Sequence, residues 1–123
     1  MHIIKLNAID STNSFLRQLN AEKTVENFTV VVAKSQSKGR GQVGTHWDSN
    51  PGENLTASVA VDVSFLPIEY RFWISMVMSL VLSKTLKAFQ IATVKVKWPN
   101  DILADQKKIS GIFVSCFCQA VVS

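Results

Sequence analysis

The chain has 123 residues, of which 47% are hydrophobic and 18% charged, with a formal net charge of +4. This length allows one domain with one buried core, and the composition excludes general disorder. The basic balance suits anionic ligands, but the lysines are scattered and lack interleaved aromatic residues, so a nucleic-acid-binding domain is the least favoured class.

The first third of the chain is predicted to hold a helix between two strands. Residues 2–9 alternate loosely in polarity, as a strand would. Ser11-Thr12-Asn13 then supplies helix-capping side chains for a helix over about residues 12–21. Residues 28–33 are β-branched and apolar, which predicts a buried strand.

The middle of the chain is predicted to form a loop, a strand and a long helix. Residues 35–52 hold most of the glycines, and a loop of this length is usually functional or disordered. Residues 54–63 predict a second buried strand. Pro67 suits the first turn of a helix reaching about Phe89, which is apolar nearly all round and should be largely buried. Its small residues recur every fourth position and would let it lie close to a sheet: Ser75, Ser79 and Ser83.

The last third is predicted to be a strand followed by a hairpin. Residues 94–98 alternate between apolar residues and lysines, and Pro99 ends the strand because it cannot donate a hydrogen bond. Asn100-Asp101 would make the turn, and residues 102–118 would form the hairpin. The element order is β-α-β-β-α-β-β, a mixed α+β class.

The two cysteines and the apolar stretches indicate the compartment. Cys116 and Cys118 do not match the usual zinc spacing, which favours buried free thiols in a reducing cytosol over a metal site. No secretory signal is visible at the N-terminus. The most apolar stretch, residues 72–82, is too short for a bilayer of roughly 30 Å. We therefore expect a cytoplasmic protein with no membrane attachment.

The glycine-rich loop matches the pattern G-x-G-x-x-G over residues 39–44. The dinucleotide-binding fingerprint needs a helix that opens directly on this loop, whereas Trp47 and Asn50-Pro51 follow here, so that site is rejected. Exposed backbone N–H groups and the Arg40 guanidinium could instead bind an anion. The alternative is a mobile surface loop.

Two later segments also carry candidate chemistry. In Lys97-Trp98-Pro99-Asn100-Asp101, the lysine could offset phosphate charge and the aspartate could hold Mg²⁺. The alternative is a plain strand and turn. Gly111, in Lys107-Lys108-Ile109-Ser110-Gly111-Ile112, suggests close approach of a ligand to a strand, and the alternative is a bulge. The capping run Ser11-Thr12-Asn13 could likewise bind a polar ligand head.

In this order and spacing, these segments resemble the catalytic domain of the biotin protein ligases over roughly residues 9–113. The combination of G-R-G-x-x-G with K-W-P-N-D and K-K-I-S-G-I carries the resemblance. It implies the class II synthetase-like α+β fold of the biotin and lipoate ligases, with a mixed, mostly antiparallel sheet packed on helices. Residues 1–123 would be a truncated part of that domain, with no N-terminal helix-turn-helix, no C-terminal barrel and therefore no DNA-binding role.

The resemblance implies an enzyme, a biotin–[acetyl-CoA-carboxylase] ligase. Biotin would attack the α-phosphate of ATP, with Mg²⁺ present, and give biotinyl-5′-adenylate and pyrophosphate. A lysine of a biotin carboxyl carrier protein would then attack the mixed anhydride. The alternative is a truncated homologue that only binds biotin or its adenylate.

The resemblance also implies roles for individual residues. Lys108, Arg40 and Lys97 would be the catalytic cations, and Lys108 would touch both the biotin carboxylate and the α-phosphate. Mg²⁺ would lie near Asp101, with Asn100. The substrate-binding residues would be Ser11, Thr12, Asn13, Gln36, Gly39, Arg40, Gly41, Trp47, Lys108 and Gly111.

The chain departs from the family pattern in two respects. Gln42 stands where arginine is often found, so retention of the adenylate is expected to be weaker. Strands left unpaired towards Ser123 would form an exposed edge, through which a homodimer could complete the site.

Overall fold

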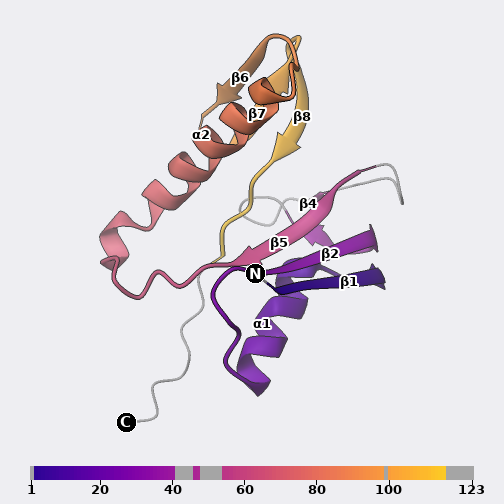
Figure 1. The fold of residues 1–123 in the computed structure, drawn as a ribbon, viewed down its shortest axis with the longest axis vertical. Helices are drawn as coiled ribbons and strands as arrows, with labels where there is room; N and C mark the ends of the chain where they lie inside the picture. Colours follow the sequence, from indigo (N-terminus) through magenta and orange to yellow (C-terminus); the bar gives the residue numbers. More distant parts are fainter. Residues whose placement is uncertain (1, 41–45, 48–53, 99, 116–123) are drawn as a thin grey trace. The chain divides into compact units, whose positions relative to one another are not determined.

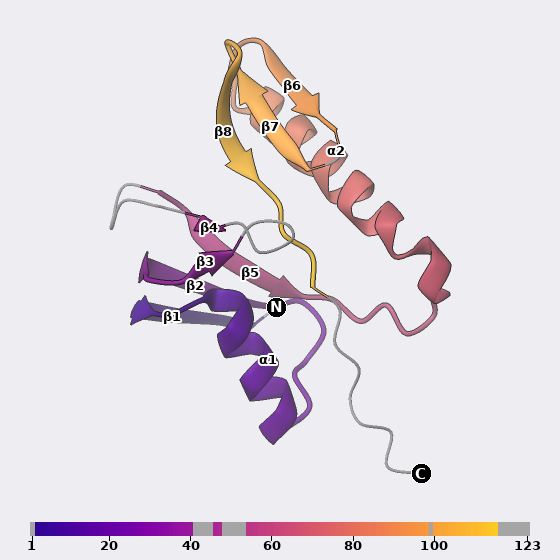
Figure 2. The same ribbon diagram turned by 180° about the vertical axis from the view of Figure 1, so that it is seen from behind.

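The computed structural model describes residues 2–40, 46–47, 54–98 and 100–115, and Figures 1 and 2 show their secondary structure from two sides. They belong to two compact units: the first is built mainly from residues 1–63, the second from residues 64–114. Buried apolar side chains occur in both units. The predictions for Gly41, Gln42, Cys116 and Cys118 lie outside the described residues.

The first unit is a three-stranded sheet with one helix packed on it (Figure 1). The strands β1 (His2–Ile9), β2 (Thr29–Gln36) and β5 (Thr56–Ala60) lie in the order β1-β2-β5. Strand β1 pairs parallel to β2, because α1 (Thr12–Glu22) makes the crossover between them, and β5 pairs antiparallel to β2. The core side chains are Leu16, Val31 and Ala33. The predicted first strand, helix and second strand are confirmed, and β2 continues as far as Gln36.

Strand β5 corrects the prediction of a second buried strand over residues 54–63. The strand is shorter, and along it only the side chain of Ser58 is buried. Val59 and the flanking Leu55 are exposed, although both are large and apolar. Within this sheet β5 pairs only with β2, which leaves it at the edge, where apolar composition alone does not secure burial.

The glycine-rich segment contains regular structure that the sequence did not predict. Strand β3 (Gly39–Arg40) pairs antiparallel with β4 (His46–Trp47), so that Gly39 lies opposite Trp47 and Arg40 opposite His46. The predicted loop is therefore a hairpin at its base.

The second unit is a helix packed on an antiparallel three-stranded sheet (Figure 2). A short 3₁₀ turn, η1 (Ile68–Tyr70), leads into α2 (Phe72–Ala88). The strands β6 (Val94–Lys97), β7 (Asp101–Ala104) and β8 (Lys107–Gly111) follow in order as a meander. The predicted strand is confirmed, and so is the hairpin as far as Gly111, where β8 ends; residues 112–115 are not in a strand, and Asp101 begins β7 rather than belonging to the turn. The buried apolar side chains are Val94 and Ile102.

Helix α2 confirms one prediction and corrects two. Its buried residues are Ser75, Ser79 and Ser83, so the face of small side chains is the one that packs closely. The helix begins at Phe72, because Pro67 opens the 3₁₀ turn instead, with the Tyr70 N–H donating to the Pro67 carbonyl at 3.0 Å.

The prediction that the rest of α2 is largely buried is wrong. Apolar side chains on its outward face are half exposed or more: Trp73, Val77, Leu80 and Val81. Apolar residues all round a helix show that any of its faces could be buried, but not which of them are. In this unit the sheet covers only one face of α2. Within the described residues, no helix has both the length and the apolar character needed to cross a membrane.

Candidate functional site

The helix cap at Ser11 positions the first group of predicted site residues. Ser11 has an extended backbone (φ −157°, ψ 135°), and its hydroxyl accepts a hydrogen bond from the Ser14 N–H at 3.3 Å. This is the geometry of a serine N-cap. Ser11 is 4% exposed, so the cap is buried and fixes the direction in which α1, with Thr12 and Asn13 in its first turn, begins after β1.

Thr12 and Gln36 meet across 24 positions of sequence. The backbone N–H of Thr12 donates to Gln36 Oε1 at 2.9 Å, and Thr12 Oγ1 lies 3.4 Å from the same oxygen. The parallel register of β1 and β2 causes this meeting, because it pairs Ile9 with Gln36 and so ends β2 beside the start of α1. The Ser37 N–H extends the ladder by donating to the Ile9 carbonyl at 3.1 Å.

Ser58 completes a polar cluster and was not predicted. Its hydroxyl lies 2.6 Å from Thr12 Oγ1 and donates a hydrogen bond to Asn13 Oδ1. Ser58 is 8% exposed and comes from β5, far along the chain. The available signal was a hydroxyl in the middle of a β-branched and alanine-rich strand, where a buried polar group needs a partner.

The predicted residues of the glycine-rich segment are also brought together. The pairing of β3 with β4 sets the backbone of Gly39 against that of Trp47, with Arg40 next to them in β3. The pairing therefore keeps Gly39, Arg40 and Trp47 next to one another.

In the second unit, register decides which lysines share a face. Residues directly opposite one another in an antiparallel pair point to the same side of the sheet. Lys97 pairs with Asp101, and Asp101 pairs in turn with Gly111. Val94 and Ile102, which are buried, lie on the other side, where α2 packs. Lys97, Asp101 and Gly111 therefore share the side of the sheet opposite α2.

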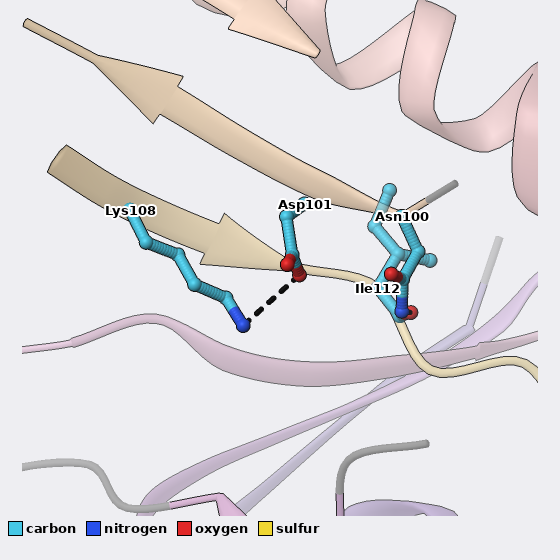
Figure 3. Close-up of polar contacts among 4 residues, drawn as sticks. All are labelled: Asn100, Asp101, Lys108 and Ile112. Carbon is cyan, nitrogen blue, oxygen red and sulfur yellow. Dashed lines mark hydrogen bonds and ion pairs between the residues drawn. The ribbon is translucent and has the colours of Figure 1, made fainter. Parts of the chain in front are cut away.

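Lys108 joins the same face through a bulge in β8. It lies opposite Leu103, whereas Ser110 lies opposite Ile102, so Ile109 is the extra residue. The bulge allows Lys108 and Gly111, three positions apart, to share the face of Asp101. Lys108 Nζ lies 3.0 Å from Asp101 Oδ1 (Figure 3). The two side chains are 43% and 22% exposed, so both are partly accessible to solvent.

Asn100 has a structural task instead. It is 9% exposed, and its Nδ2 donates to the Ile112 carbonyl at 2.7 Å, while the Ile112 N–H donates to the Asn100 carbonyl at 3.0 Å (Figure 3). These bonds tie the start of β7 to the end of β8. The Nδ2 donor of the buried amide is therefore engaged by Ile112, whereas a metal ion would bind the amide through Oδ1.

Among the predicted site residues of the second unit, Asp101 supplies the only carboxylate that could bind a metal ion. Within the part of the chain that the structure describes, no group of three or more His, Cys, Asp or Glu could hold a metal ion. Asp101 supplies a carboxylate that is already paired with Lys108. One carboxylate fits a magnesium ion that arrives with a nucleotide, because phosphates and water fill most of its coordination. It does not fit a resident metal held by protein ligands alone.

A mixed, mostly antiparallel α+β fold that carries lysines beside a carboxylate on a strand, and a glycine-containing hairpin, has the features of a ligase that activates a carboxylic acid with a nucleotide. The model of the Biotin/lipoate A/B protein ligase family matches residues 6–120. The chain belongs to this family, which confirms the resemblance and the fold class predicted from its motifs.

Individual relatives agree with this assignment. The bifunctional ligase/repressor BirA of Escherichia coli is 33% identical over 109 residues, which are 89% of this chain and 33% of that protein. The biotin–[acetyl-CoA-carboxylase] ligase of Mycobacterium tuberculosis is 32% identical over 105 residues, which are 83% of this chain and 40% of that protein. The chain thus spans well under half the length of these relatives.

Solved structures show the same fold. The biotin protein ligase of Aquifex aeolicus in complex with biotin and ATP superimposes with a TM-score of 0.75 at 31% identity, over 91% of this chain and 45% of that one. The biotin protein ligase of Leishmania major in complex with biotinyl-5-AMP gives a TM-score of 0.74 at 28% identity, over 89% of this chain and 50% of that one.

Proposed function

We propose that this protein is a biotin–protein ligase that forms biotinyl-5′-adenylate from biotin and ATP and passes the biotin to a lysine of a carboxyl carrier protein. The observation that carries the proposal is the face shared by Lys97, Asp101 and Lys108. Three residues of two separate motifs lie together there, two of them in an ion pair. The ATP and biotinyl-adenylate complexes of related ligases support the same chemistry.

The polar cluster of the first unit would hold biotin. Ser11, Thr12, Asn13 and Gln36 offer hydroxyl and amide groups that suit the ureido head of biotin, with the Gly39–Arg40 strand and Trp47 beside the carboxylate and adenylate. Gly41 would contribute its backbone N–H group to the same binding site. Gly111 has no side chain, so the backbone of β8 could approach the substrate closely.

The lysines would supply the electrostatics of adenylation. In this step a carboxylate oxygen attacks the α-phosphorus, a new P–O bond forms, and pyrophosphate leaves with the electrons of the broken P–O bond. Both reactants are anions, so fixed cations lower the barrier by offsetting charge in the transition state. Lys108 would act at the α-phosphate, and Lys97 and Arg40 at neighbouring oxygens.

Asp101 would serve the reaction in two ways. Its carboxylate holds Lys108 at 3.0 Å, which keeps the long side chain near the strand. Its other oxygen could bind the Mg²⁺ that ATP carries, so the metal enters as part of the substrate. The carrier lysine then attacks the anhydride carbonyl and releases AMP. We place this activity in the cytoplasm and propose a homodimer as the assembly.

The direct test is to incubate the protein with biotin, Mg²⁺ and ATP labelled in the α-phosphate. The expected product is labelled biotinyl-5′-adenylate. When lipoate replaces biotin, no labelled lipoyl-adenylate should form. Biotin binding by calorimetry without adenylate formation would instead support a homologue that only binds. Absence of both product and binding heat would exclude the proposal.

A further inference from the structure

Ser58 links two of the proposed biotin-binding residues although it belongs to no recognised motif. It lies in β5 opposite Val31, and its buried hydroxyl contacts both Thr12 and Asn13 of α1. Because Ser58 bridges a strand and the first turn of a helix, its single hydroxyl hydrogen decides the direction of its bonds with Thr12 and Asn13.

The donors can be assigned by counting hydrogens. Asn13 Oδ1 can only accept, so Ser58 gives it the single hydrogen of its hydroxyl. The 2.6 Å contact between Ser58 and Thr12 then requires Thr12 as the donor. Thr12 has no second hydrogen for Gln36, whose Oε1 instead accepts from the Thr12 backbone N–H at 2.9 Å.

This arrangement fixes the orientation of two amides. The oxygens of Asn13 and Gln36 are both engaged inside the cluster, which leaves Nδ2 and Nε2 as the groups that each amide can offer to a ligand. Both residues are half-buried, unlike the buried Thr12 and Ser58, so they are the more accessible members of the cluster. An amide N–H donor suits an acceptor atom of a ligand.

We propose that Ser58 is a positioning residue that holds the Asn13 amide with its N–H donors towards the ureido carbonyl oxygen of biotin. The inference rests on the proposed function and adds the source of its specificity. Ser58 does not touch the substrate. It acts through Asn13 and makes the site prefer an acceptor over a donor at the ureido carbon.

The probe is 2-iminobiotin, in which the ureido oxygen is replaced by an imino group that becomes a cationic donor when protonated. Calorimetry would give the affinity ratio of biotin to 2-iminobiotin for each protein. In Ser58→Ala the Asn13 amide is free to turn its oxygen outward, where it would face the ureido oxygen of biotin. The affinity ratio of biotin to 2-iminobiotin is therefore expected to fall about tenfold, the effect of losing one hydrogen bond. Ser58→Thr keeps the hydroxyl and should restore the ratio.

A matched control separates positioning from structure. Ser83→Ala makes the same chemical change at a buried serine of α2, outside the cluster, and should leave the ratio unchanged. A purely structural role for Ser58 would weaken both ligands equally, and an unchanged ratio in Ser58→Ala would overturn the inference.

A second variant covers the case in which Ser58→Ala does not fold. Asn13→Asp keeps the acceptor for Ser58 but removes the outward N–H donors, and it should shift the preference towards 2-iminobiotin. A ratio equal to that of the unaltered protein would again overturn the inference. If the unaltered protein binds neither ligand, the proposed function fails as well, whereas normal binding with unchanged ratios defeats the inference alone.

Discussion

At the scale of single residues, Lys107 and Lys108 show how one position along a strand decides which face of the sheet a lysine occupies, and so whether it lies beside Asp101. Lys107 lies opposite Ala104 and so points to the side of the sheet that α2 covers, whereas Lys108 lies opposite Leu103 and reaches Asp101. The sequence shows two adjacent lysines of equal charge. The hairpin register assigns them to opposite faces.

This pair of lysines gives a controlled prediction. Lys108→Ala should lower the rate of biotinyl-adenylate formation by about 10²-fold or more, a loss of the size expected when one stabilising group is removed from a transition state. Lys107→Ala removes the same charge from the other face and should keep the rate within about twofold. Single-turnover assays with labelled ATP would measure both, and equal rates in the two variants would show that the cation is misplaced.

Asp101 gives a second prediction, because it combines an ion pair with the proposed magnesium contact. Its partner is 43% exposed, so Asp101→Asn should cost at most about 1 kcal/mol of unfolding free energy in a urea titration. The Mg²⁺ concentration that half-saturates adenylation should rise several-fold. An unaltered Mg²⁺ dependence with a slower reaction would mean that Asp101 acts only by holding Lys108.

At the scale of elements, α2 shows how small side chains set the distance between a helix and a sheet. Ser79 is 1% exposed and lies between two other buried serines on the face towards β6 and β7. A close-packed contact of this kind leaves no room for a larger group.

Overpacking this contact should destabilise the protein. Ser79→Leu is expected to lower the unfolding free energy by about 1–3 kcal/mol, since the helix must move away from the sheet. Leu80→Ser makes a change of similar size at the next residue, which is 65% exposed, and should matter much less. Thermal or urea unfolding would compare them, and equal losses would mean that Leu80 is covered in solution.

The elements also show what a sequence can predict. The Ser11 cap, the strand that begins at Val94 and the hairpin after it were foreseeable because their determinants are local: a hydroxyl before a helix, an alternation of lysine and valine, a turn. The end of the hairpin strand at Gly111, rather than near residue 118, was not foreseen. The role of Ser58 was not, because its partner Asn13 is 45 positions away. The exposure of Trp73 and Leu80 was not either, since apolar periodicity does not reveal which faces of a helix are covered.

At the scale of the whole molecule, the residues proposed to bind and activate the substrates belong to two compact units. The first holds the hydroxyl and amide cluster around Thr12 together with the Gly39–Arg40 strand, and the second holds Lys97, Asp101 and Lys108. The motif order of the biotin/lipoate ligase family runs through both. We propose that residues of both units serve adenylation, and this is the central claim of the proposed function.

Biotin-dependent exchange of labelled pyrophosphate into ATP tests that claim most directly, because exchange requires reversible adenylation. We predict exchange with biotin present, no exchange without biotin, and loss of exchange in both Thr12→Val of the first unit and Lys108→Ala of the second. Exchange that persists without biotin, or that survives either substitution unchanged, would contradict the claim.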